Sequence, residues 1–371
     1  MLIYLILMFV IYFGFLLACI AGWRKFVSQS NSHGATGNEL VSVVVAVRNE
    51  ESFLAPLLAS LRYQDFRHNK FEVILVNDHS TDRSEQIILD WIKDNSHMQC
   101  TCIHSSGRGK KEALTEGIRQ ANGEIILTTD ADCVIPTDWI SGMVFSFNPE
   151  TTLVIGLVKI QQHQSVFSKL QALEFSSLLG SGMALHALGF SVMCNGASLA
   201  FRKSSFEAVN GYEGNIHIPS GDDEFLMRKL EKKFPGSIQS IRRPSVVVTT
   251  QPQPSLRDFF HQRLRWAGKW KVNDSIVAKA LAMFIFVFQL TSLIVFGLLF
   301  TGKLLLVVSM LLGLKFLIEG YFLFHVSKRL HQGFSIPVFL LLQVVYPFYV
   351  VTMGIFSQLL DYEWKGRSSN A

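Results

Sequence analysis

The chain has 371 residues, of which 49% are hydrophobic and 17% are charged, and its formal net charge is +5. So small a basic excess gives no argument for binding to nucleic acid, and it is typical of a membrane protein with basic cytoplasmic flanks. The mean hydropathy of +0.30 is high for a soluble protein. The apolar residues gather toward the two ends of the sequence, around a more polar central region.

The first apolar segment is long enough to cross a bilayer. Residues 2–22 are almost uninterruptedly apolar, and about 20 such residues span a hydrocarbon core. Residues 16–19 resemble a lipoprotein cleavage site, but no basic residue precedes the segment and it is longer than the usual core of a signal peptide. Because Arg24 and Lys25 follow it directly, we expect an uncleaved transmembrane anchor at residues 1–26 whose end lies in the cytoplasm.

Strands and helices alternate in the central region, residues 41–252, which follows a polar linker at residues 27–40. Apolar and β-branched runs predict strands at 41–47, 71–76 and 124–129, with helix-like stretches at 52–62, 83–93 and 110–121. This alternation predicts βαβ units and an α/β fold with a parallel sheet. Ligands bind beyond the carboxyl ends of the strands in such sheets, and polar residues follow each predicted strand there.

The last region, residues 276–371, contains three long apolar segments at 277–300, 303–326 and 336–360. Lys328 and Arg329 place the loop between the last two segments in the cytoplasm. Three full crossings would then leave the C-terminus outside, although the tail at residues 364–367 carries positive charge. Pro337 and Pro347 leave open that the last segment is broken or re-entrant.

Two polar clusters follow predicted strands. A carboxylate at Asp78 could accept hydrogen bonds from a nucleobase, although the same segment could simply cap a helix. In an extended segment Asp130 and Asp132 would point the same way, and their hard oxygens would suit Mg²⁺ or Mn²⁺. Such an ion would neutralise the charge that builds on a diphosphate leaving group. A solvated acidic turn is the plainer interpretation of this second cluster.

A third cluster, Asp222-Asp223-Glu224, precedes a helical stretch at residues 225–231. Acidic residues are common at helix N-termini for electrostatic reasons alone. A carboxylate there could also be the general base that takes the proton from an acceptor hydroxyl.

The fourth cluster is the pentapeptide QRLRW, in which Gln262, Arg265 and Trp266 share one face of a helix. An arginine can hold a diphosphate through parallel hydrogen bonds, and a tryptophan can stack on a sugar ring. The surrounding residues 253–275 mix aromatic and basic side chains, so they predict an amphipathic helix on the membrane surface. The segment could be an anchor, a binding element or both.

The ordered motifs VSVVVAVRNE, VNDHSTD, GKKEAL, TTDADC, CNGASLAFRK, SGDDEFLMRKL and QRLRW together resemble those of glycosyltransferase family 2, whose members are inverting enzymes of the GT-A fold. The resemblance covers roughly residues 41–271, and the apolar segments have the arrangement of integral membrane members. It implies a Rossmann-like GT-A domain at residues 41–252 with flanking transmembrane helices.

The resemblance also implies roles for individual residues. Donor-binding residues would be Glu50, Asp78, Lys110, Asp130, Gln262, Arg265 and Trp266. Asp132, together with Asp130, would hold Mg²⁺ or Mn²⁺ on the diphosphate. The acceptor side would be lined by Cys194, Asn195 and Gly196. Asp223 would be the catalytic base, beside Asp222, which stands where many members have glutamate.

The leading interpretation is an inverting transfer of one sugar from a nucleotide sugar, most simply a UDP-sugar, to a lipid or lipid-linked acceptor at the cytoplasmic side of the membrane. The alternative is a processive synthase of the cellulose or poly-N-acetylglucosamine type, for which four apolar segments offer little material to build a channel. A non-catalytic nucleotide-sugar sensor is disfavoured by the intact base candidate and metal pair. Lys315 and Glu319 prompt the idea of a transporter, but at i,i+4 spacing we expect them to pair with each other.

Overall fold

The computed structural model describes residues 1–29, 39–216, 218, 220–268, 275–360, 363–364 and 367–368. Most of the predicted linker, the end of the predicted amphipathic segment and most of the C-terminal tail lie outside these residues. The chain divides into two compact units. We call one the helical unit, formed by Met1–Ser28, Gln162–Val192 and Pro252–Ala371, and the other the sheet unit, formed by Gln29–Gln161 and Met193–Gln251.

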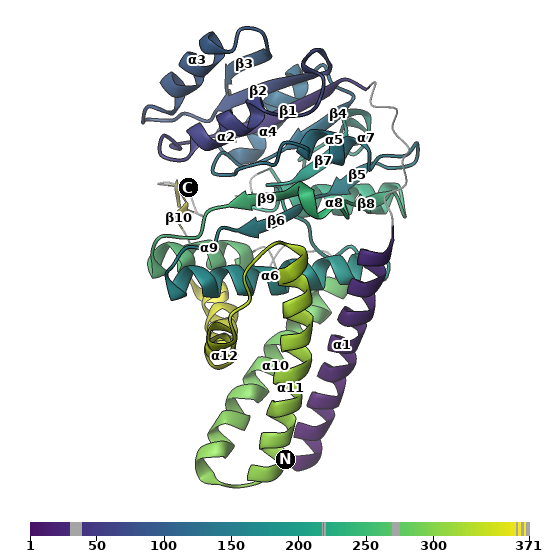
Figure 1. Ribbon diagram of the computed structural model, residues 1–371, viewed down its shortest axis with the longest axis vertical. Coiled ribbons are helices and arrows are strands. Elements are labelled where there is room, and N and C mark those ends of the chain that lie inside the picture. The colour runs from purple at the N-terminus through teal and green to yellow at the C-terminus, as the bar shows by residue number, and fades with distance from the viewer. Residues whose placement is uncertain are drawn as a thin grey trace. The chain divides into compact units, whose positions relative to one another are not determined.

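The sheet unit is built on a seven-stranded mixed sheet with the order β3-β2-β1-β4-β7-β5-β8 (Figure 1). Its strands are β1 (Val41–Val47), β2 (Phe71–Asn77), β3 (Gln99–His104), β4 (Ile125–Thr128), β5 (Leu153–Ile155), β7 (Leu199–Arg202) and β8 (Ile238–Ser240). A separate parallel pair is formed by β6 (Leu157–Ile160) and β9 (Val247–Thr250). The helices of this unit are α2 (Leu54–Arg62), α3 (Ser84–Asp94), α4 (Lys110–Gln120), α5 (Trp139–Val144), α7 (Lys203–Ala208) and α8 (Asp222–Lys233), with short 3₁₀ turns at His68–Lys70 and Pro244–Val246.

The predicted α/β class is confirmed, and β1, β2 and β4 match the three predicted strands. β1 is the central strand of the parallel part and pairs with β2 and β4 at its two edges. Its side chains are buried on both faces of the sheet, and Ser42 is the only polar residue among them. The predicted strands pair in parallel, but the whole sheet is mixed, because β7 runs antiparallel to β4 and β5. β7 begins beside the end of β4, where the Thr128 hydroxyl donates to the carbonyl oxygen of Gly196 at 3.1 Å, and it runs back along β4.

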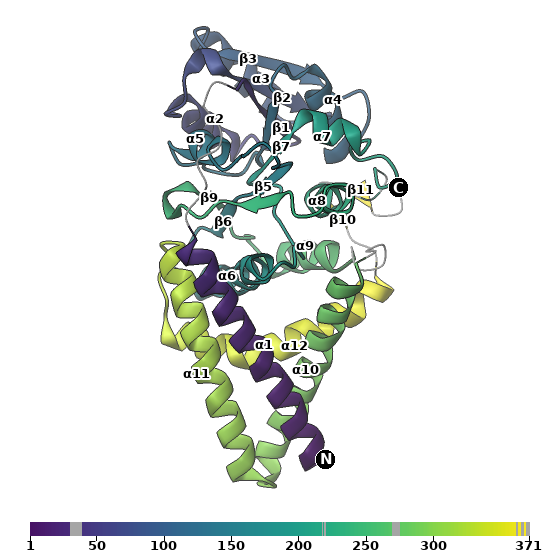
Figure 2. The ribbon, with the colours of Figure 1, turned by 90° about the vertical axis from the view of Figure 1, so that its right-hand side faces the viewer.

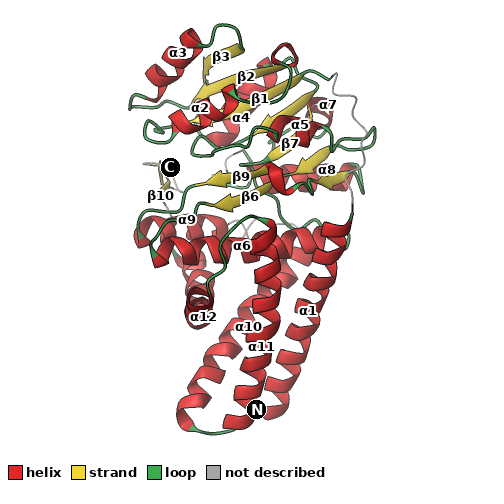
Figure 3. Ribbon diagram, viewed as in Figure 1, coloured by secondary structure: helices red, strands yellow, loops and turns green. Residues whose placement is uncertain are grey.

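The described residues of the helical unit form six helices, which Figure 3 draws in red. They are α1 (Leu2–Ser28), α6 (Val166–Ala187), α9 (Leu256–Gly268), α10 (Ile276–Thr301), α11 (Leu305–Arg329) and α12 (Ile336–Leu359), and a short antiparallel pair, β10 (Glu363–Trp364) and β11 (Arg367–Ser368), follows them. Among the described residues, α1, α10, α11 and α12 are long and apolar enough to cross a bilayer. The four predicted apolar segments are therefore helices, as expected for a multi-pass membrane protein.

Within this unit α1, α10 and α11 run alongside one another, whereas α12 lies across them, as Figures 1 and 2 both show. α6 comes from the middle of the predicted 41–252 domain, yet it packs along α1. The two backbones are in direct contact, since a Cβ at Gly22 would lie 2.3 Å from the carbonyl oxygen of Ala184. Only glycine therefore fits at this crossing.

A polar cluster joins α1, α11 and α12 among apolar side chains. The predicted pairing of Lys315 with Glu319 is confirmed, at 3.1 Å. Tyr12 donates to Glu319 at 2.5 Å, and the Gln343 amide donates to the same carboxylate at 2.6 Å. The ion pair is thus satisfied within the protein, which is how charged groups persist in an apolar segment.

Candidate active site

The first part of the site lies at the carboxyl ends of β1 and β2. The carboxylate of Asp78 is almost fully buried and accepts the backbone N–H of Gly109 with both oxygens, each at 3.1 Å. Arg48 donates to the carbonyl oxygen of Asp78 at 2.9 Å. The backbone N–H of Glu50 donates to the hydroxyl of Ser84 at 2.8 Å, which ties the loop after β1 to the start of α3. Two of the predicted donor-binding residues, Glu50 and Asp78, therefore lie at one edge of the sheet.

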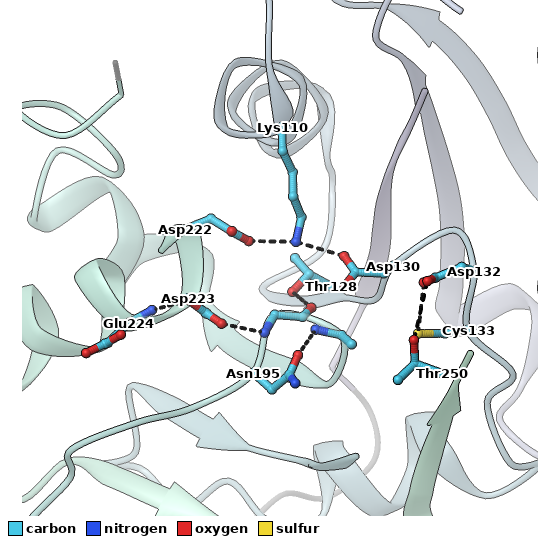
Figure 4. Close-up of polar contacts among 12 residues, drawn as sticks. Lys110, Thr128, Asp130, Asp132, Cys133, Asn195, Asp222, Asp223, Glu224 and Thr250 are labelled. Atoms are coloured by element: carbon cyan, nitrogen blue, oxygen red, sulfur yellow. Dashed lines mark hydrogen bonds and ion pairs between the residues drawn. The ribbon is translucent and has the colours of Figure 1, made fainter. Parts of the chain in front are cut away.

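Lys110 is the first residue of α4, and its ammonium group joins two of the predicted acidic clusters. It lies 2.8 Å from a carboxylate oxygen of Asp130 and 2.9 Å from one of Asp222, as Figure 4 shows. Burial alone lowers the pKa of Lys110, but the two carboxylates outweigh burial and raise this pKa well above its ordinary value. The lysine is therefore a fixed cation between Asp130 and Asp222.

The loop before β7 brings the second acidic residue of the pair into the same place. The backbone N–H of Gly196 donates to Asp223 at 3.0 Å, and the N–H of Glu224 donates to the other oxygen of that carboxylate at 2.7 Å. A Cβ at Gly196 would lie 2.8 Å from the Asp222 carboxylate, so the close approach requires glycine. Asn195 uses its side-chain oxygen to accept the N–H of Ala197 at 2.9 Å.

Cys194 precedes this turn, and its side chain is half-buried. The three predicted acceptor-side residues, Cys194, Asn195 and Gly196, are thus consecutive in one loop, and Gly196 brings that loop onto Asp222 and Asp223.

Asp130 and Asp132 do not lie in an extended segment, and the geometric argument for their pointing the same way is wrong. The N–H of Cys133 donates to the carbonyl of Asp130 at 3.1 Å and closes a turn. Asp130 faces Lys110, whereas Asp132 accepts the hydroxyl of Thr250 at 3.3 Å and contacts the Cys133 thiol at 3.7 Å (Figure 4).

Asp130 and Asp132 contribute only carboxylate oxygens, the donor type that Mg²⁺ binds, and the Asp130 carboxylate also contacts Lys110. The described residues contain no group of three or more histidine, cysteine or acidic side chains placed to hold a metal. Mg²⁺ in particular is usually held by one or two carboxylates together with substrate phosphates and water. Asp130 and Asp132 supply such a donor set, all of oxygen.

The last three predicted residues belong to α9 in the helical unit. Gln262, Arg265 and Trp266 occupy one helix of thirteen residues, and the ring of Trp266 lies 6.1 Å from that of Phe175 on α6. Residues 269–274 of the predicted amphipathic segment, which include Trp270, lie outside the described residues.

Several residues that contact the site residues were not predicted from the sequence. Thr128 and Thr250 end β4 and β9, and each donates its hydroxyl into the site. A polar residue at the end of a β-branched run, as in the segment VVTT, would have been the hint. Glu174 and Arg263 of the helical unit were also missed, because their partnership joins positions 89 residues apart.

The chain is similar to a known protein family, to individual curated proteins and to a solved structure. Residues 42–209 match the family model described as Glycosyl transferase family 2. A poly-beta-1,6-N-acetyl-D-glucosamine synthase of Staphylococcus epidermidis is 28% identical over 260 residues, which cover 68% of this chain and 61% of that protein. A synthase of the same name from Staphylococcus aureus (strain COL) is 26% identical over 235 residues, which cover 62% and 54%. The chain thus matches less than two thirds of the length of these relatives.

A solved structure with a similar fold is the mannosyltransferase PcManGT from Pyrobaculum calidifontis in complex with GDP-Man and Mn²⁺. Its TM-score is 0.56 at 19% identity, and the match covers 95% of both chains. The sheet unit therefore has the Rossmann-like GT-A fold, and long apolar helices precede and follow it in the chain. Residues 42–209 are therefore similar to glycosyltransferase family 2, the family that the motifs of the sequence resemble.

Proposed function

We propose that the chain is a membrane polysaccharide synthase that polymerises N-acetylglucosamine from UDP-N-acetylglucosamine. The similarity to two poly-β-1,6-N-acetylglucosamine synthases carries this proposal. The sugar of UDP-N-acetylglucosamine is α-linked, so an inverting displacement yields a β linkage, which is the linkage in the names of those relatives. The comparisons thus favour the processive alternative over the lipid acceptor that the sequence ranked first.

Asp223 is the proposed base. The acceptor hydroxyl gives its proton to the Asp223 carboxylate while its oxygen attacks the anomeric carbon. The bond from that carbon to the diphosphate oxygen breaks, and the electron pair leaves with UDP. The backbone N–H groups of Gly196 and Glu224 fix the carboxylate, so its orientation is set before the acceptor arrives.

In this proposal both acidic and basic residues bind the donor. Glu50 and Asp78 would bind the nucleoside, while Lys110 and Arg265, with Gln262 and Trp266 beside it, would contact the diphosphate and the sugar. Mg²⁺ or Mn²⁺ on Asp130 and Asp132 would neutralise charge on the departing diphosphate. The acceptor would enter past Cys194, Asn195 and Gly196.

The function is tested with the full-length chain in lipid nanodiscs, supplied with UDP-N-acetylglucosamine, a divalent cation and a short N-acetylglucosamine primer. We expect a ladder of products longer than the primer, read by mass spectrometry, and at least about 10²-fold less product with Asp223→Asn. A lipid carrying a single added sugar would instead support the lipid-acceptor interpretation. Binding of the donor without any sugar transfer would support the interpretation as a non-catalytic nucleotide-sugar sensor.

Lys110→Met should lower transfer by about 10²-fold, the size of effect seen when one preorganised electrostatic group is removed. The substitution also leaves Asp130 and Asp222 without the cation between them, so donor binding should weaken. Steady-state kinetics of UDP release would measure both effects. Lys93→Met on α3 changes the same charge away from the site and serves as the control. Wild-type turnover in Lys110→Met would remove the lysine from the mechanism.

We also propose that the sheet unit faces the cytoplasm and that α12 does not cross the membrane. Both ends of α6 and the start of α9 continue directly into the sheet unit along the chain. These helix ends are therefore on the same side of the membrane as the sheet unit. Just before α12, Gln332 accepts the hydroxyl of Ser176 on α6 at 2.5 Å, and just after α12, β10 lies beside α9. α12 therefore starts and ends on one side, as a re-entrant or in-plane helix.

This arrangement leaves α1, α10 and α11 as crossings, and it removes the conflict over the positive tail. The basic residues at the ends of α1 and α11 and those of the tail then share the cytoplasmic side. Green fluorescent protein fused after residue 150 or 371 should fluoresce, and alkaline phosphatase inserted at Lys303 should be active. Phosphatase activity after residue 371 would mean that α12 crosses, and activity after residue 150 would overturn the cytoplasmic orientation.

A further inference from the structure

Arg263 is a buried cation next to Gln262, Arg265 and Trp266, which we call the Q-x-x-R-W box. Its side chain is 2% exposed, and its guanidinium donates to Glu174 of α6 at 2.6 Å, a carboxylate that is 5% exposed. Burial alone would lower the pKa of Arg263, but the Glu174 carboxylate outweighs it and raises this pKa. A pair desolvated to this degree is costly to build, so its placement calls for a reason beyond stability.

The guanidinium touches two of the three residues of the box. One of its nitrogens donates to the side-chain oxygen of Gln262. Its Cζ atom also lies over the ring of Trp266, 4.2 Å from the centroid, and over the ring of Phe259, 4.4 Å from that centroid. Arg263 therefore constrains the amide of Gln262 and the indole of Trp266 at once.

Glu174, the partner of Arg263, also accepts a hydrogen bond from a third helix. Tyr349 of α12 donates its hydroxyl to Glu174 at 3.4 Å, and its ring lies 5.6 Å from that of Phe259. α6, α9 and α12 thus meet around one carboxylate, which fixes the turn of α9 that carries the box.

We infer that Arg263, anchored by Glu174, is a positioning residue that sets the orientation of Gln262 and Trp266 for sugar transfer. The inference rests on the proposed function, in which those two side chains contact the donor. It assigns a task to the second residue of the pentapeptide, which the spacing of the box leaves undefined. The task depends on the planar fork of arginine, because a lysine offers a point charge that neither stacks nor forks.

Three variants separate positioning from simple stabilisation. Arg263→Lys keeps a cation beside Glu174 but loses the stacking on Trp266 and the forked hydrogen bonds. Glu174→Gln leaves a buried arginine without its countercharge, which should destabilise the protein. Glu174→Gln combined with Arg263→Gln removes both charges, so stability should largely return while the contacts with Trp266 stay absent.

The matched control is the double substitution Lys315→Gln and Glu319→Gln. It removes the other buried ion pair of the helical unit, which contacts no residue of the box in the described hydrogen bonds and ring contacts. Its turnover per folded molecule should stay near that of the wild type.

Each variant is prepared as the full chain in nanodiscs with 5-fluorotryptophan, and the ¹⁹F signal of Trp266 is assigned by Trp266→Phe. Turnover is measured as UDP release from UDP-N-acetylglucosamine, with thermal unfolding as the measure of stability. We expect Arg263→Lys and the uncharged pair to shift the Trp266 signal and to lower turnover by about 10²-fold, the loss caused by a displacement of about 1 Å. Their unfolding temperatures should stay close to that of the wild type.

An unchanged Trp266 signal in folded Arg263→Lys would overturn the inference, and so would wild-type turnover in the uncharged pair. A failure of the proposed function has a different signature. A wild-type enzyme that adds one sugar to a lipid still releases UDP, so the comparison of variants remains valid, and only the product identifies the acceptor.

Discussion

Replacing Asp223 by asparagine should lower sugar transfer by about 10²–10⁴-fold, the usual contribution of a general base, while the affinity for UDP changes little. The asparagine keeps the size of the side chain but cannot take the proton. It also turns an NH₂ group toward one of the two backbone N–H donors, from Gly196 and Glu224, that the carboxylate accepts. Turnover and calorimetric binding of UDP, measured on the same preparation, would separate the two effects.

Asp222→Asn is the matched comparison, since it changes the neighbouring carboxylate by the same atoms. Asp222 is engaged by Lys110 at 2.9 Å, so we expect its loss to weaken the donor site and to leave the base in place. Near-normal turnover in Asp223→Asn together with a dead Asp222→Asn would reverse the assignment within the pair. Activity in both variants would refute base catalysis by either residue.

The parts of the fold that sequence predicts well are those with a strong local pattern. β1 and β2 are buried apolar runs followed by polar residues, and the four apolar segments have the length of a bilayer. The candidate residues also follow from position, because Asp78 and Asp130 come one and two residues after parallel strands whose carboxyl ends share one edge.

The remaining features depend on contacts between distant positions. α6 has no long apolar run that would separate it from the sheet unit, yet a glycine contact with α1 places it in the helical unit. The direction of β7 depends on where its loop meets β4. The hydroxyl of Thr250 reaches Asp132 across 118 positions. The path of α12 depends on packing against α6 and α9, which hydropathy does not encode.

Removing divalent cations should lower transfer by at least about 10³-fold, since a Lewis acid on a departing diphosphate contributes several kcal/mol. Asp130 and Asp132 are the two proposed ligands of the metal ion. One of them faces Lys110 while the other accepts from Thr250. Two carboxylates bind Mg²⁺ or Mn²⁺ weakly without the phosphates that complete the site. We therefore expect tight Mn²⁺ binding only when UDP is present.

Calorimetry with Mn²⁺, with and without UDP, tests this independently of activity. Asp132→Asn should abolish the dependence of UDP binding on Mn²⁺. Thr250→Val is the matched control, because it removes only the hydroxyl that donates to Asp132 and should retain that dependence. Adding Mg²⁺ or Mn²⁺ back to chelated wild-type enzyme should restore transfer. Full turnover in excess EDTA would show that Lys110 and the other cations of the chain carry the diphosphate charge alone, and Asp132 would then lose its proposed role as a metal ligand.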